Sequence, residues 1–229
     1  MRRTLGTNDG LAALNLPTRF DVTRFPRQVE RYLAGTRHPY HRAILKNYLR
    51  HVLLEISGYW DEILVPALTV DEPVYRLGHL GGTVVLTGRD QVERFYRESV
   101  EAGKNVAGAL TVYVGVENFG VVTEARWAEI LPGAVMREDH GTLGADPGRH
   151  YLVTHNISQV LSYGRDAKLT GKRLYDDPAS YRYELLAPHD VVTPADARRE
   201  LASLLARAVI LHEADPWTAV LPMMAPSAP

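Results

Sequence analysis

The sequence predicts an α+β protein in which a curved antiparallel sheet wraps on helices. Helical periodicity dominates residues 27–66 and returns at 87–103, on either side of a short strand region. Strand periodicity then runs through four consecutive segments, and a last amphipathic helix follows. This order favours segregated helices and a meandering sheet over alternating βαβ units. Such a half-barrel leaves a hydrophobic cavity between its concave face and the longest helix.

The N-terminal region, residues 1–35, is predicted to be an arm followed by a short helix over 27–35 that Gly35 ends. Residues 36–190 form the α+β domain. Residues 191–229 hold a C-terminal helix, with Thr193 as its cap and Pro194 in its first turn, and a loose tail.

The clearest element of the domain is a helix over 41–56, which Pro39 precedes and Gly58 ends. A short helix at 59–66 follows it. The next helix spans 87–103, with Thr87 and Asp90 as its predicted cap. The predicted strands, of which the first two can also be a strand and a loop, are 67–78, 82–88, 106–116, 120–131, 149–164 and 168–177. Residues 136–148 are predicted to be a loop.

Composition limits the function. The chain has 229 residues and is 45% hydrophobic, which suits one globular domain with extensions. Its net charge of −1 gives no support for a nucleic-acid partner, and the absence of cysteine excludes disulfides, thiolate metal sites and a thiol nucleophile. No apolar run approaches the roughly 18 residues of a membrane span, and the N-terminus is a poor secretory signal. We therefore expect a cytoplasmic protein with no membrane partner.

Polar side chains interrupt the apolar face of the long helix. His41, Tyr48 and Glu55 are spaced seven apart and so share one direction, and His51 lies four residues before Glu55, within pairing distance. One interpretation is the edge of the buried face, where the polar tips reach water. The other is a cavity wall, which suits the ring and hydroxyl of Tyr48.

A second set of polar residues lies on the strand at 149–164. Its odd positions are bulkier and more apolar than its even ones, so they should face the core, and they include His155 and Gln159. These two side chains either hydrogen-bond one another or the backbone, or they point into a pocket.

The dipeptide Asp71-Glu72 also has two interpretations, a solvent-exposed position or a position in the cavity. A solvated strand end is the commonest place for such carboxylates, and alternation lets only one of them face inward. Pro73 cannot donate a ladder hydrogen bond, so the strand is expected at an edge or rim there. A carboxylate in an apolar cavity has a raised pKa and becomes a useful base near neutral pH.

Three segments resemble the nuclear transport factor 2-like superfamily, in its ketosteroid isomerase and SnoaL-like (polyketide cyclase-like) branch. They are "YLRHVLLEISGYWDEILVPALTVDEPVYR", "GRDQVERFYRE" and "YGRDAKLTGKRLY", and the match covers roughly residues 40–175. The resemblance implies that Tyr48 supplies an oxyanion hydrogen bond and that Glu72, 24 residues later, is the base. Gln159 then stands at the second oxyanion position, where an amide donates a hydrogen bond but is no strong acid. The resemblance also implies a homo-oligomer, a dimer or trimer.

The resulting hypothesis is a lyase or isomerase that needs no cofactor. It would act on a small, largely apolar, aromatic or polycyclic compound by proton abstraction followed by elimination or rearrangement. Some longer relatives resemble lyases that release formaldehyde from lignin-derived diaryl compounds, and a polyketide cyclase, a ketosteroid-isomerase-like enzyme or a non-catalytic binding protein are the alternatives. Glu138, Asp139 and His140 form a weak candidate cation site, but we expect no metal. The predicted catalytic residues are Glu72, Tyr48, His155 and Gln159, and the predicted substrate-binding residues are His51, Glu55, His41, Tyr96, Trp127 and Tyr151.

Overall fold

The structure is a computed structural model that describes residues 19–79, 82–138, 140–142 and 144–213. Its helices are α1 (Arg24–Gly35), α2 (Pro39–Ser57), α3 (Trp60–Ile63), α4 (Arg89–Glu101), α5 (Gly133–Glu138) and α6 (Pro194–Glu213). Its strands are β1 (Thr69–His79), β2 (Gly82–Thr87), β3 (Ala107–Glu117), β4 (Gly120–Pro132), β5 (His150–Tyr163), β6 (Leu169–Asp176) and β7 (Arg182–Leu185). The sequence predictions for the first arm residues and the tail lie outside the described residues.

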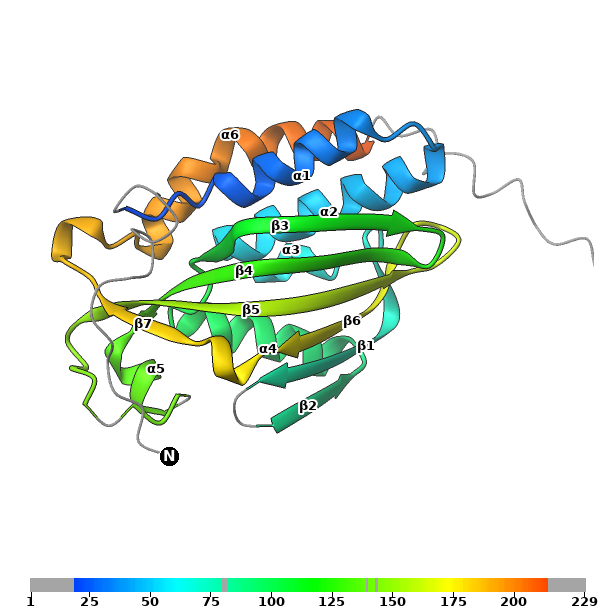
Figure 1. Ribbon diagram of the computed structural model, residues 1–229. Helices are drawn as coiled ribbons and strands as arrows, with labels where there is room; N and C mark the ends of the chain where they lie inside the picture. Colours follow the sequence, from blue (N-terminus) through cyan, green and yellow to red (C-terminus); the bar gives the residue numbers. More distant parts are fainter. Residues whose placement is uncertain (1–18, 80–81, 139, 143, 214–229) are drawn as a thin grey trace, which may run out of the picture.

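Within the described residues the strands form one curved sheet with the order β2-β1-β6-β5-β4-β3, and β7 pairs with β5 (Figure 1). The run from β3 to β6 is antiparallel throughout, as predicted. Figure 1 shows α1, α2 and α6 lying together along the β3 side of the sheet, and α1 packs on β3 while α6 packs on α2. The predicted α+β class, with N-terminal helices on a curved sheet, is confirmed.

Three features of the fold differ from the prediction. First, β1 and β6 run parallel, because the hairpin of β1 and β2 joins the sheet at the end of the meander. Second, the loop predicted at 136–148 begins inside α5, and β7 was missed. Third, Thr87 and Asp90 do not cap α4: Gly88 is the cap residue and no side chain caps the helix there.

The ends of the other helices follow the sequence. Gly58 ends α2 in the left-handed conformation (φ 73°), which glycine adopts without steric cost. At the start of α6, the Asp196 amide donates to Thr193 Oγ1 at 3.1 Å, and the Thr193 amide donates to Asp196 Oδ2 at 3.0 Å. This reciprocal pair is a capping box, so the predicted role of Thr193 is confirmed. Among the described helices, none has the length and hydrophobicity that a bilayer crossing requires.

The described residues form two hydrophobic cores. The larger lies between the sheet and helices α1, α2, α4 and α6. The smaller lies at the start of β5, where Tyr151 and Val153 form one cluster with Met136 of α5 and with Tyr181 and Tyr183. The polar residues discussed below lie on the sheet face that both cores cover.

Asn47 ties α2 to the sheet and gives a first test of the fold. Its Nδ2 donates to the carbonyl oxygens of Leu68 at 2.7 Å and Ala167 at 2.9 Å, and the residue is buried. Asn47→Ala leaves both carbonyls without this donor, so we expect the free energy of unfolding to fall by about 2 kcal/mol. Urea unfolding measures it, with the exposed Asn118→Ala as the control. A loss below about 0.5 kcal/mol would contradict the structural role.

Candidate functional site

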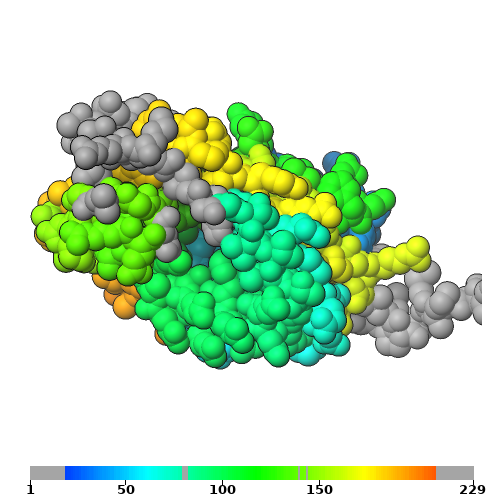
Figure 2. All heavy atoms as spheres, turned by 90° about the horizontal axis from the view of Figure 1, so that it is seen from below, coloured from blue at the N-terminus to red at the C-terminus, as the bar shows by residue number. Residues whose placement is uncertain are grey.

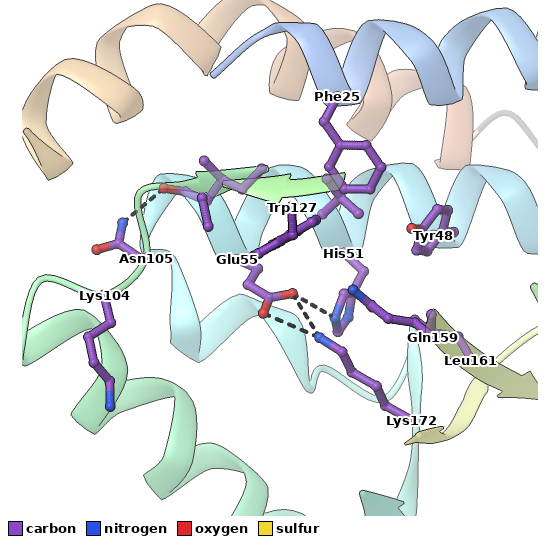
Figure 3. Close-up of a pocket in the computed structure, with 13 residues that line it drawn as sticks. Phe25, Tyr48, His51, Glu55, Lys104, Asn105, Trp127, Gln159, Leu161 and Lys172 are labelled. Atoms are coloured by element: carbon purple, nitrogen blue, oxygen red, sulfur yellow. Dashed lines mark hydrogen bonds and ion pairs between the residues drawn. The ribbon is translucent and has the colours of Figure 1, made fainter. Parts of the chain in front are cut away.

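A pocket lies between α2 and the concave face of the sheet (Figure 3). Helix α2 turns His51 and Glu55 toward it, four residues apart on one face. Strand β5 contributes Gln159, and β6 contributes Lys172. The remaining residues of its wall are Phe25, Tyr48, Val52, Ile56, Lys104, Asn105, Ala107, Trp127 and Leu161.

The polar groups of the pocket form a network, which we call the pocket cluster: Tyr96, His51, Glu55 and Lys172. Lys172 Nζ lies 3.4 and 3.5 Å from the two carboxylate oxygens of Glu55, and His51 Nε2 lies 3.4 Å from Glu55 Oε2. The Tyr96 hydroxyl reaches His51 Nε2 at 3.1 Å. Burial alone would raise the pKa of Glu55, but Lys172 and His51 outweigh it and lower the pKa to about 2. Glu55 and Lys172 are therefore an ion pair at neutral pH.

The pocket is smaller than the sequence indicated. Its cavity volume is about 40 Å³. One water molecule needs roughly 10–15 Å³ on this measure, so the pocket holds about three waters or one small polar group. A polycyclic compound does not fit inside it as it stands.

A second polar group lies on the same sheet face, and we call it the β5 cluster: His155, Asp176, Glu129 and Tyr181. His155 Nδ1 donates to Asp176 Oδ1 at 2.5 Å, and His155 Nε2 lies 3.5 Å from Glu129 Oε1. The Tyr181 ring stacks on the His155 ring with centroids 4.3 Å apart, and its hydroxyl donates to Asp176 Oδ2. His155 and Asp176 are both nearly inaccessible to solvent, with side-chain exposures of 5% and 3%.

The charge of the β5 cluster follows from these contacts. Burial by itself lowers the pKa of His155, but the hydrogen bond with Asp176 and the nearby negative charge of Glu129 outweigh it and raise the pKa to about 9. His155 is thus an imidazolium between two carboxylates at neutral pH. Burial also raises the pKa of Tyr181, and Asp176 adds to that, so its hydroxyl stays protonated.

Trp127 connects the two clusters. It lines the pocket with its ring, and its Nε1 donates to Glu129 Oε1 at 2.9 Å. Its partner in the β4–β5 register is His155. Figure 2 shows the surface hollowed between the segment around α5 and α4.

The predicted base, Glu72, does not line this pocket, and the prediction that its side chain faces inward is wrong. Glu72 is exposed on β1, where Pro73, Tyr75 and Leu77 take the inward positions. Its carboxylate lies beside Gly88 at the start of α4. The neighbouring Asp71 is also exposed and pairs with Arg89 at 3.2 Å. The solvated strand end, the alternative interpretation, is the one that the structure shows.

Two predicted substrate-binding residues do not line this pocket, and their role in binding stays a prediction. His41 bonds through Nε2 to Asn118 Oδ1 at 3.0 Å, on the turn after β3. Tyr151 belongs to the smaller core, where its hydroxyl accepts from the Asp146 amide at 2.8 Å. Tyr96 does not line the pocket itself but bonds to His51, which does.

The structure brings the other predicted residues together. Tyr48, His51, Glu55, Trp127 and Gln159 line the pocket, and His155 lies next to Trp127. Their roles in catalysis or binding stay predictions. Burial and the nearby Glu55 raise the pKa of Tyr48, so that its hydroxyl is protonated.

Sequence reasoning missed the partners of these residues, namely Lys172, Asp176, Glu129 and Tyr181. Three of them had a detectable signal. Lys172 and Asp176 share the inward parity of β6 with the apolar Leu174, and Glu129 shares that of β4 with Trp127. Tyr181 gave no signal in the sequence, because it follows a short 3-10 helix at 178–180 that was not predicted. Across the parts of the chain that the structure describes, no set of three His, Asp or Glu side chains is arranged to hold a metal ion.

Comparison with known proteins adds a likeness in fold. No protein-family model matches the sequence, and no curated protein matches it. Among solved structures, the epoxide hydrolase/cyclase-like enzyme SalBIII, described for pyran ring formation in the polyether salinomycin, is 14% identical with a TM-score of 0.44, over 62% of this chain and 95% of its own. A protein described as a SnoaL-like polyketide cyclase from Jannaschia sp. CCS1 is 16% identical with a TM-score of 0.43, over 62% and 91%. An NTF2-like protein from Anabaena variabilis is 14% identical with a TM-score of 0.45, over 62% and 93%.

Proposed function

We propose that the protein is an acid–base enzyme that needs no cofactor and acts on a small, largely apolar compound by isomerisation, cyclisation or elimination. The observation that carries the proposal is His155, held between Asp176 and Glu129 on the concave face of the sheet beside the pocket. A buried histidine with a carboxylate on one ring nitrogen has a fixed tautomer and orientation, which proton transfer requires.

The proposal assigns a role to each part of the site. His155 exchanges the proton through Nε2, since Asp176 holds Nδ1. Asp176 is a positioning residue, and Tyr181 fixes the plane of the ring by stacking on it. An aromatic ligand lies against Trp127, whose ring borders the pocket. The body of the ligand occupies the space outside the small pocket, because the pocket admits only one polar group.

Nitrobenzisoxazole tests the proton transfer with a generic probe. A base removes the C–H proton of its isoxazole ring, the N–O bond breaks, and a nitrile and a coloured nitrophenolate form. We expect His155→Gln to lower kcat/KM by roughly a hundredfold or more. The wild-type rate should rise with pH through about 9, where His155 loses its proton. His189→Gln, at an exposed histidine beside Asp190, is the matched control and should keep full activity.

The binding-protein alternative predicts a different outcome. Naphthol fluorescence reports on binding to an apolar site without any reaction. An enzyme should lose turnover in His155→Gln and keep naphthol binding, whereas a binding protein should bind naphthol and show no turnover above free imidazole. A panel of diaryl compounds with a hydroxymethyl group, assayed for formaldehyde, then tests the finer assignment as a formaldehyde-releasing lyase.

A further inference from the structure

Gln159 is a buried polar side chain without a partner. It is 5% exposed, and among the described residues its amide makes no hydrogen bond or ion pair. Figure 3 shows the side chain pointing into the pocket from β5. The polar atoms of Gln159 are not among the fully enclosed atoms that lack a partner, so the amide faces the open space of the pocket. A ligand in that space can supply its hydrogen bonds.

Lys172 brings a cation to the same place. It is 7% exposed, and β6 positions it on the strand beside Gln159, opposite Leu161. Glu55 holds its ammonium group with two long contacts of 3.4 and 3.5 Å, so the third N–H remains directed elsewhere. The ammonium group and the amide thus offer hydrogen-bond donors to one small space.

The charged residues and the size of the pocket limit the chemical class of ligand that it can bind. Its wall carries the ion pair of Lys172 with Glu55 and a second lysine, Lys104. Its volume of about 40 Å³ equals roughly three waters, the size of one carboxylate group. Trp127 and Phe25 border it with their rings, at a centroid distance of 5.4 Å from each other.

We propose that Lys172 and Gln159 form a carboxylate-binding subsite, so that the ligand of this protein is an aromatic carboxylate rather than a neutral compound. The carboxylate enters the pocket, accepts hydrogen bonds from Lys172 Nζ and the Gln159 amide, and leaves the ring against Trp127. Glu55 is a positioning residue that orients the lysine. This inference rests on the proposed function only in taking the same pocket as the substrate site.

Benzoate and its neutral analogue benzamide test the subsite by calorimetry in low-salt, chloride-free buffer. We expect the wild type to bind benzoate about tenfold more tightly than benzamide, the ratio that one charge-assisted hydrogen bond gives. Gln159→Met removes the amide at nearly constant volume and should weaken benzoate binding about fivefold. Lys172→Met should abolish the preference for benzoate. Lys168→Met, a lysine near the start of the same strand that pairs with Asp166 outside the pocket, is the matched control.

Several outcomes would overturn the subsite. They are no benzoate binding to the wild type, equal binding of benzamide, or benzoate binding that both variants retain. Tighter binding of benzylamine would assign the pocket to Glu55 and a cationic ligand instead. Gln159 is not part of the ion pair, so benzoate binding to Gln159→Met still tests the subsite even if Lys172→Met fails to fold. His155→Gln should bind benzoate normally, so loss of turnover there and loss of binding here are separate failures.

Discussion

A His155→Gln substitution is expected to lower the free energy of unfolding by about 3 kcal/mol at roughly pH 6, and by far less at roughly pH 10. The folded state raises the pKa of His155 to about 9, above the roughly 6.5 of an unfolded chain. A group with a raised pKa stabilises the fold fully below its unfolded pKa. That stabilisation is lost as the pH rises through the folded value. The pH window of the effect therefore runs from roughly 6.5 to about 9.

Urea unfolding of both proteins across this pH range measures the effect. His189→Gln serves as the control, because His189 is 82% exposed beside Asp190 and should change stability by less than about 0.5 kcal/mol at either pH. A His155→Gln loss that stays constant across the range would show that packing, and not the charge of the imidazolium between Asp176 and Glu129, stabilises the β5 cluster. In that case the charged state assigned to the site would be wrong.

The sequence predicted those parts of the fold that local patterns determine. The odd positions of β5 repeat at the spacing of a strand, so they identified His155 and Gln159 correctly as buried. The spacing of α2 placed Tyr48 on or beside the buried face, and the structure shows that Tyr48 and His51 are both buried. The prediction that Glu72 faces inward failed because the alternation of a strand allows two assignments, in which either the odd or the even residues face the core. The apolar residues that set the phase of β1, Tyr75 and Leu77, follow a register shift between Thr69 and Val74.

The partners of the buried residues depend on contacts between distant segments, which a local pattern does not contain. Lys172 meets Glu55 across 117 positions of the chain, and Asp176 meets His155 across 21. The parallel pairing of β1 with β6 places β6 between β1 and β5, and no spacing in the sequence reports it. A buried His or Glu on a predicted core face does indicate that a partner of opposite charge exists, since an isolated buried charge is too costly. It does not say which residue that partner is.

Glu55→Leu is expected to lower the free energy of unfolding by about 3 kcal/mol, because it leaves the buried ammonium group of Lys172 without a counter-charge. The Lys172 side chain is 9% exposed, and both of its carboxylate contacts are to Glu55. This value is at the lower end of the usual range for a broken buried pair, because the Glu55 side chain is 31% exposed. Chemical denaturation measures the loss. Glu62→Leu, in the ion pair with Arg50 at 3.8 Å and 48% exposed, should cost less than about 0.5 kcal/mol.

The double variant Glu55→Leu/Lys172→Met separates stability from binding. Apolar replacement of a complete buried pair is often neutral or stabilising, so the double variant should recover most of the stability that Glu55→Leu loses. A double variant as unstable as the single one would contradict this, and would show that His51 and the rest of the pocket cluster need the carboxylate. If the double variant is stable and binds no benzoate, the ion pair is dispensable for folding and needed for the ligand. That result would mean that the ion pair of Glu55 and Lys172 serves ligand binding and not the stability of the fold.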